Sequence, residues 1–312
     1  MIPTSSNGPE GITQSVHALV LTWNGAPLLS DCLKALLPQR ARVVVVDNAS
    51  TDGTAELLQR DFPQVEHLRL GENFGYGRAN NEGLRRALEA GAEFVALVNN
   101  DVEVGPEWLA RLREAARAQP RAGLFTGTLL FKDEERVNST GLVIDGFGRA
   151  RDRDFRLPLE QLQRSDGPVA GVSGGAALLR VSMLREIGLF DEAYFAYYED
   201  VDLSLRAAEA GWTSWYVREA WARHRFGASF GPGSPRQRYL LGRGHLRTLA
   251  LHQPLLKAAA LVPLTVAYRA AFKAPLEILR ARPALAWAEL RAAGAGAVEA
   301  LKVFSGRSRR PR

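Results

Sequence analysis

Apolar residues follow two alternating patterns over the first hundred positions. Four short runs have the length and composition of buried strands: residues 15–22, 42–47, 65–70 and 93–98. Between them, apolar residues recur three or four positions apart, which predicts helices over residues 26–37, 54–61 and 77–90. This alternation predicts an α/β fold, Rossmann-like, with a mostly parallel sheet, helices on both faces and a binding crevice at the carboxyl ends of the strands.

The rest of the chain is less regular. Residues 122–169 are irregular and charged, which predicts excursion loops or a short hairpin. Helices are predicted near residues 181–187 and 200–210, with a strand ending near Val217 between the second helix and the C-terminal region. After Pro235 the composition is rich in Ala, Leu and Arg and predicts several helices. Four prolines are expected to break them: Pro254, Pro263, Pro275 and Pro283.

The single cysteine and the first residues bear on the compartment. Cys32 lies in the predicted amphipathic helix 26–37 and has no partner for a disulfide, so a reducing compartment is expected. The first twelve residues lack the basic start and apolar run of a signal peptide and predict a loose tail. A cytoplasmic protein is therefore expected.

Charge is divided unevenly along the chain. Residues 1–220 contain 23 basic and 31 acidic residues, whereas residues 221–312 contain 17 and 3. A basic tail suits an anionic surface, either membrane or nucleic acid. Its basic residues are scattered without a recognition motif, so no nucleic acid is expected. The apolar run 258–268 is shorter than the roughly 20 residues that span a bilayer. Peripheral contact with the inner face of the membrane, a soluble helical appendage and a contact with a second copy of the chain remain as alternatives.

Polar side chains follow two of the predicted strands. Asp47 ends the second strand and should face the crevice, where it could accept hydrogen bonds from a nucleobase or ribose, whereas Asp52 can cap the next helix. Asn99, Asn100 and Asp101 close the fourth strand. This triplet is either a turn or the source of a carboxylate ligand for Mg²⁺ or Mn²⁺.

The segment 72–81 follows a strand and opens a helix, so its backbone amides and Arg78 could meet a diphosphate. It differs from a dinucleotide fingerprint in two ways. Asn80 stands where a third glycine would follow Gly75 and Gly77, and the segment follows the third predicted strand rather than the first.

An acidic run begins another helix. Carboxylates at a helix start are stabilised by the helix dipole, which is a purely structural explanation for Glu199, Asp200 and Asp202. Three aromatic residues beside them favour a sugar-binding surface instead: Phe195, Tyr197 and Tyr198. His224 follows a predicted strand and becomes a plausible metal ligand if it lies opposite Asp101.

In this order, the motifs resemble those of the family-two inverting glycosyltransferases of GT-A fold, especially the rhamnosyltransferase-like branch that builds bacterial surface polysaccharides. The resemblance covers residues 16–252. Five motifs carry it: Thr22-Trp23-Asn24, VVDNASTDGT (45–54), ENFGYGRANN (72–81), NND (99–101), and the stretch from Gly174-Gly175 to YYEDVDLSLRAAEAGW (197–212).

The resemblance implies transfer of a sugar, rhamnose in that branch, from a nucleotide diphosphate donor to a hydroxyl of a glycan or polyprenol-linked acceptor, with a divalent metal (Mn or Mg) as cofactor. It implies a general base at Asp200, paired with Glu199, and metal ligands at Asp101 and His224. The implied donor residues are Thr22, Asn24, Asp47, Asn73, Gly75, Arg78, Asn80, Asn99 and Asn100. The implied acceptor residues are Gly174, Gly175, Tyr198 and Trp212.

These roles divide the chain into a flexible tail (1–13), a GT-A catalytic domain (14–234) and a basic helical C-terminal region (235–312). Within the catalytic domain, residues 14–121 form the nucleotide-sugar half and residues 122–234 the acceptor half. Two departures from the family pattern stand out: NND supplies one carboxylate where many relatives have two, and His245 stands where asparagine is common. A sugar nucleotidyltransferase and a non-catalytic nucleotide-sugar or glycan binding module are the rival functions.

Overall fold

The computed structural model describes residues 16–227 and 231–307; the predicted tail 1–13 lies outside them. The first strands and helices agree with the sequence pattern to within one residue at each end. They are β1 (Val16–Thr22), α1 (Ala26–Leu36), a 3₁₀ turn (Leu37–Gln39), β2 (Arg42–Asp47), α2 (Thr54–Asp61), β3 (Glu66–Arg69), α3 (Tyr76–Glu89) and β4 (Phe94–Asn99).

The middle of the chain adds two long strands, several short strands and three helices. They are β5 (Val102–Val104), α4 (Trp108–Ala118), β6 (Ala122–Phe131), β7 (Val137–Ser139), β8 (Leu142–Ile144), β9 (Ala150–Asp152), a 3₁₀ turn (Leu159–Gln161), β10 (Gly167–Val169), β11 (Ala176–Arg180), α5 (Val181–Ile187), α6 (Glu199–Glu209) and β12 (Thr213–His224).

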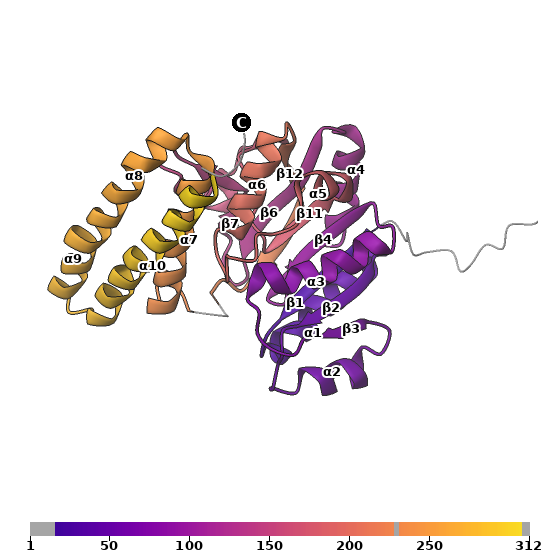
Figure 1. Cartoon of the computed structure of the whole chain (residues 1–312). Coiled ribbons are helices and arrows are strands. Elements are labelled where there is room, and N and C mark those ends of the chain that lie inside the picture. Colours follow the sequence, from indigo (N-terminus) through magenta and orange to yellow (C-terminus); the bar gives the residue numbers. More distant parts are fainter. Residues whose placement is uncertain (1–15, 228–230, 308–312) are drawn as a thin grey trace, which may run out of the picture.

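Most strands of the described chain join one mixed sheet in the order β10-β12-β6-β11-β4-β1-β2-β3, with β5 beside β12 and β7 beside β6. The half formed by β4, β1, β2 and β3 is parallel, as predicted. β11 runs antiparallel to both β4 and β6, and β12 runs parallel to β6. Strands β1, β2, β4 and β12 therefore end at the same edge of the sheet, where the polar motifs lie (Figure 1).

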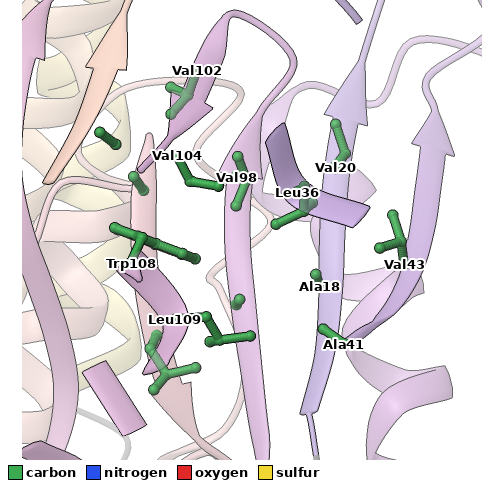
Figure 2. Packing of buried hydrophobic residues seen from close by; sticks show 14 of the residues in the cluster. Ala18, Val20, Leu36, Ala41, Val43, Val98, Val102, Val104, Trp108 and Leu109 are labelled. Carbon is green, nitrogen blue, oxygen red and sulfur yellow. The ribbon is translucent and has the colours of Figure 1, made fainter. Parts of the chain in front are cut away.

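Side chains alternate between two hydrophobic layers because successive strand residues point to opposite faces. On one face, Ala18 and Val20 of β1 pack in the same core as Leu36 of α1 and Trp108 of α4 (Figure 2). On the other face, Leu19 belongs to the core formed with α3, α5 and α6. Helices thus cover both faces, which fixes the sheet and leaves its carboxyl edge open for a site.

The prediction of loops over residues 122–169 is wrong at its start. All ten residues of β6 are buried, and β6 lies between β11 and β12. Glycines made this strand difficult to predict, yet the packing requires one of them: a Cβ at Gly127 would lie 1.5 Å from the carbonyl oxygen of Ala220. The predicted short hairpin does occur, as the antiparallel pair β8 and β9.

The C-terminal region is helical, as predicted, and its helices group at one side of the molecule (Figure 1). It contains α7 (Pro235–His252), α8 (Leu255–Tyr268), a π-helical turn (Arg269–Lys273), α9 (Ala274–Leu279) and α10 (Pro283–Arg307).

Two of the four prolines do not break the helices. Pro263 lies inside α8, and Pro275 lies in the first turn of α9 directly after the π-helical turn. The helical run Leu255–Leu279 is consequently continuous and much longer than its apolar segment 258–268. By length and composition alone it is the one helical run among the described residues that could cross a membrane.

Polar contacts attach α7 to α6 and to the loop that precedes it. The Arg247 guanidinium lies 2.5 Å from Asp191, and the hydroxyls of Tyr194 and Thr248 are 2.7 Å apart. His252 lies 2.9 Å from the carboxylate of Asp202 on α6. Helix α7 is thus part of the wall around the sheet edge.

Candidate functional site

A cavity of about 300 Å³ lies at the carboxyl edge of the sheet. The strand ends contribute Leu21, Trp23, Asn48, Asn99, Asn100 and His224. The start of α6, strand β9 and residues 173–175 form further walls, and Leu241 of α7 completes the enclosure. The crevice predicted from the strand pattern is therefore a real cavity, lined mainly by polar strand ends and aromatic residues.

Asn48 positions the predicted diphosphate segment at one side of this cavity. Its side chain donates to Asn73 Oδ1 (2.9 Å) and to the Gly75 carbonyl (3.2 Å), and accepts from the Phe74 N–H (2.9 Å). Gly75 has a φ of +79°, and a Cβ there would lie 2.1 Å from the carbonyl oxygen of Phe195. Only glycine fits this close approach.

Of the predicted donor residues, Asn73, Gly75, Asn99 and Asn100 line the cavity. The other five lie outside its lining: Thr22, Asn24, Asp47, Arg78 and Asn80.

Each of these five side chains has a partner within the protein. Asp47 is fully buried and accepts from the Ser50 N–H, and Asn24 accepts from the Thr51 N–H. Thr22 accepts from the Asn100 amide, Asn80 donates to the Tyr76 carbonyl, and the Arg78 guanidinium lies 3.7 Å from the centre of the Phe74 ring. These residues shape the loops around the cavity.

Asp101 and His224 meet at the strand ends, as the sequence had suggested. Asp101 Oδ1 lies 3.4 Å from His224 Nε2 and is buried without a hydrogen-bond partner. The other ring nitrogen, Nδ1, lies 2.8 Å from Asn138 Oδ1, which holds the imidazole in place. A buried carboxylate oxygen without a hydrogen-bond partner beside an imidazole nitrogen is an arrangement that suits a bound cation.

The Glu199-Asp200 pair begins α6 at another wall of the cavity. Tyr198, just before it, has a left-handed backbone with φ +75°, an unfavourable conformation for a non-glycine residue that turns the chain into the helix. The Gly174 N–H donates to Asp200 Oδ2 (3.0 Å), while the Gly174 carbonyl accepts from the Tyr76 hydroxyl (2.6 Å). These bonds hold the Asp200 carboxylate in one orientation.

Burial changes the protonation of this pair. It raises the pKa of Glu199 well above its ordinary value, and the neighbouring Asp200 charge adds to the effect. Burial also raises the pKa of Asp200, against the hydrogen bonds from the backbone of Gly174 and Val201. The pair therefore favours a protonated Glu199 beside an ionised Asp200, which separates the roles of two adjacent acids.

The predicted acceptor residues are divided between two places. Gly174, Gly175 and Tyr198 line the cavity. The structure does not bring Trp212 there, because its indole N–H donates to Glu186 (2.9 Å) at the far end of α6. Asp202 of the acidic run also points elsewhere, toward Arg206 and His252.

Asn48 and Asp152 are two of the cavity residues that the sequence did not reveal. Asn48 directly follows Asp47 in a motif that the sequence analysis singled out. Because adjacent strand residues point in opposite directions, the two side chains could not both face the cavity, and this was the available signal. Asp152 lies on β9, in the stretch expected to be irregular, and burial raises its pKa to about 6. Nothing local marks Asp152, since only the tertiary fold brings the hairpin β8–β9 to the cavity.

Solved structures establish the fold class. A mannosyltransferase from Pyrobaculum calidifontis, determined with GDP-Man and Mn²⁺, superposes with a TM-score of 0.55 at 20% identity, over 92% of this chain and 87% of that one. Staphylococcus aureus TarS in complex with UDP-GlcNAc gives a TM-score of 0.55 at 16% identity, over 94% and 92%. The architecture is the GT-A fold with a C-terminal helical region.

Sequence comparison establishes the family. Residues 18–188 match the model described as glycosyl transferase family 2. An N-acetylglucosaminyl-diphospho-decaprenol L-rhamnosyltransferase of Mycobacterium tuberculosis is 32% identical over 243 residues, 70% of this chain and 79% of that protein. A dTDP-rhamnosyl transferase of Shigella flexneri is 25% identical, over 64% and 65%. The chain belongs to glycosyl transferase family 2 and is a glycosyltransferase similar to rhamnosyltransferases.

Proposed function

We propose that this glycosyltransferase moves L-rhamnose from a nucleoside diphosphate, with inversion at the anomeric carbon, to a sugar hydroxyl of a polyprenyl-diphosphate-linked acceptor in surface polysaccharide synthesis. The observation that carries the proposal is one cavity into which both Asp200 and His224 open, with Asp101 against His224. The names of the rhamnosyltransferase relatives supply the sugar and the lipid-linked acceptor.

In this mechanism Asp200 takes the proton from the acceptor hydroxyl as that hydroxyl attacks the anomeric carbon. Its raised pKa strengthens it as a base, and the Gly174 N–H keeps its carboxylate in place. A single displacement by a hydroxyl from one side, with departure of the diphosphate from the other, inverts the anomeric centre. Because Glu199 is protonated and therefore neutral, the Glu199-Asp200 pair carries a single negative charge.

Asp101 and His224 would hold the divalent ion. The unpartnered Asp101 Oδ1 and the neighbouring Nε2 of His224 fit such an ion. No three carboxylate, imidazole or thiol groups converge within residues 16–227 and 231–307, so donor oxygens and water would complete the shell. When bound, the ion neutralises negative charge that develops on the leaving diphosphate.

A peripheral contact with the inner face of the membrane is part of the proposal. Leu256, Leu264, Phe272 and Leu279 recur seven or eight positions apart along α8, the π-helical turn and α9, and each is more than half exposed. This spacing places them along one side of the helical run. Lys257, near one end of it, supplies positive charge for an anionic leaflet.

The test is release of nucleoside diphosphate from dTDP-rhamnose, UDP-glucose and GDP-mannose, with and without Mn²⁺. We expect metal-dependent release from dTDP-rhamnose, lost in Asp101→Ala and retained in Arg282→Gln, an exposed change outside the cavity. Release from a different donor would refute rhamnose as the sugar. No release and no nucleotide binding across the panel would refute the transferase mechanism in favour of a glycan-binding module.

A further inference from the structure

A second cavity, of about 510 Å³, lies between α7 and α10 beside the catalytic cavity. Phe195 lines both cavities and is therefore the wall they share. We refer to this second cavity as the arginine groove, because Arg236, Arg243 and Arg291 line it. It lies outside the segment that matches the family model, and none of the roles assigned above uses it.

The groove is strongly cationic. Its lining contains three guanidinium groups and no acidic side chain. Arg236 lies over the Phe195 ring (5.4 Å to the centroid) and Arg291 over the Tyr239 ring (5.0 Å), and these contacts orient the two guanidinium groups.

One nearby acid reduces this charge only in part. Glu299 lies 3.4 Å from Arg243, but it also lies 2.9 Å from Arg247, so it is shared between two guanidinium groups. The groove therefore keeps a positive charge that suits a ligand with more than one negative charge.

The same groove has an apolar side. The Trp287 side chain lines it and is 63% exposed, so its ring is open to a ligand. Leu240, Ala284 and Ala288 lie in the same lining. A ligand that fills the groove should thus combine an anionic group with an apolar chain.

We infer that the arginine groove binds the diphosphate and the first isoprene units of the lipid-linked acceptor. This inference rests on the proposed function, in which the acceptor is a sugar attached to a polyprenyl diphosphate. Guanidinium groups form paired hydrogen bonds with phosphate oxygens, and Trp287 covers the isoprenoid. The sugar then extends past Phe195 into the catalytic cavity, toward Asp200.

The test uses farnesyl diphosphate, which has the diphosphate and isoprenoid but no sugar, and calorimetric titration of the full chain. We expect saturable binding that weakens roughly 10-fold in Arg236→Gln and in Arg291→Gln, as for loss of one charge-assisted contact. Trp287→Ala should weaken farnesyl diphosphate but not inorganic pyrophosphate. Arg282→Gln, an exposed change at the turn before α10, is the matched control and should leave binding unchanged.

A kinetic measurement separates this inference from the proposed function. With a sugar-diphospho-farnesyl acceptor, the arginine variants should raise the acceptor KM while hydrolysis of the nucleotide sugar without acceptor stays unchanged. Sugar transfer that is insensitive to these variants would refute the groove and leave the proposed function standing. Arginine-dependent binding of farnesyl diphosphate without transfer from any nucleotide sugar would refute the function and leave the groove standing. Absence of saturable farnesyl diphosphate binding by the unmodified chain would overturn the inference directly.

Discussion

Replacing Asn48 by alanine tests how the donor side of the cavity is held. Asn48 is 3% exposed and its amide makes three hydrogen bonds to residues 73–75. Asn48→Ala removes all three and leaves an Asn73 oxygen, a Phe74 N–H and a Gly75 carbonyl without that partner. The segment that carries Asn73 and Gly75 into the cavity then loses its attachment to the end of β2.

The expected loss of stability follows from these contacts. Removing one partner of a hydrogen bond costs about 1 kcal/mol when water can reach the group left behind, and up to about 3 when it cannot. Because this segment borders an open cavity, the lower value applies, and three bonds give a loss of about 3 kcal/mol in the free energy of unfolding. The affinity for the nucleotide sugar should fall as well, since part of the cavity wall becomes disordered.

Asn81→Ala is the matched control. Asn81 is also buried, and its amide also makes three hydrogen bonds, two to the backbone of Phe190 and one to Glu192. It does not line the cavity. Urea denaturation should show similar losses for both variants, whereas donor titration should show weaker binding only for Asn48→Ala. Equal donor affinities, or a loss below about 1 kcal/mol for Asn48→Ala, would contradict the reasoning.

Three further predictions concern catalysis, pH and the membrane. Asp200→Asn should lower kcat by roughly 10² to 10⁴ with unchanged donor affinity. Because burial raises the pKa of this base, the rate of the unmodified enzyme should fall on acidification at a pH above the ordinary aspartate pKa, and pH–rate profiles of both proteins check these expectations. Burial lowers the pKa of His252, but hydrogen bonds to Asp202 and Glu209 outweigh it and raise the pKa above its ordinary value. The stabilising effect of the charged imidazole is therefore complete below about pH 6.5 and is lost as the pH rises through the pKa of the folded state. Denaturation should therefore show a larger deficit for His252→Gln at pH 6 than at pH 9, and an equal deficit would exclude the linkage. Leu279→Glu should reduce flotation with anionic vesicles by about tenfold or more, since it removes roughly 2 kcal/mol of apolar burial, and unchanged flotation would refute membrane contact through this side of the helical run.

The parallel half of the fold was predictable from sequence because its strands are buried on both faces. Runs such as residues 43–46 contain only valine, and the intervening helices have clear apolar spacing. Strand β6 was not predictable in this way. Its glycines and threonines are typical of a loop. Position 127 requires glycine because the backbone of Ala220 passes close to it, and that contact exists only in the folded chain.

The candidate site shows the same division. Asp101 and Asp200 could be identified because each lies at the end of a predicted strand or the start of a predicted helix. Asp152 could not, since its place in the cavity depends on long-range packing of the hairpin β8–β9. Asp47 lies at a correctly predicted strand end but is fully buried, and the adjacent Asn48, which points in the opposite direction, lines the cavity.

Helix α7 has a consequence for how such enzymes can diversify. It contributes Leu241 to the catalytic cavity and Arg236 and Arg243 to the arginine groove, yet it begins well after residue 188, where the family match ends. The proposed donor-binding residues, all between positions 22 and 100, and the helix that borders the proposed acceptor groove therefore lie in separate stretches of the sequence. Exchange of the C-terminal stretch between relatives offers a route by which evolution, or a protein engineer, can change the molecule that receives the sugar while keeping the sugar itself.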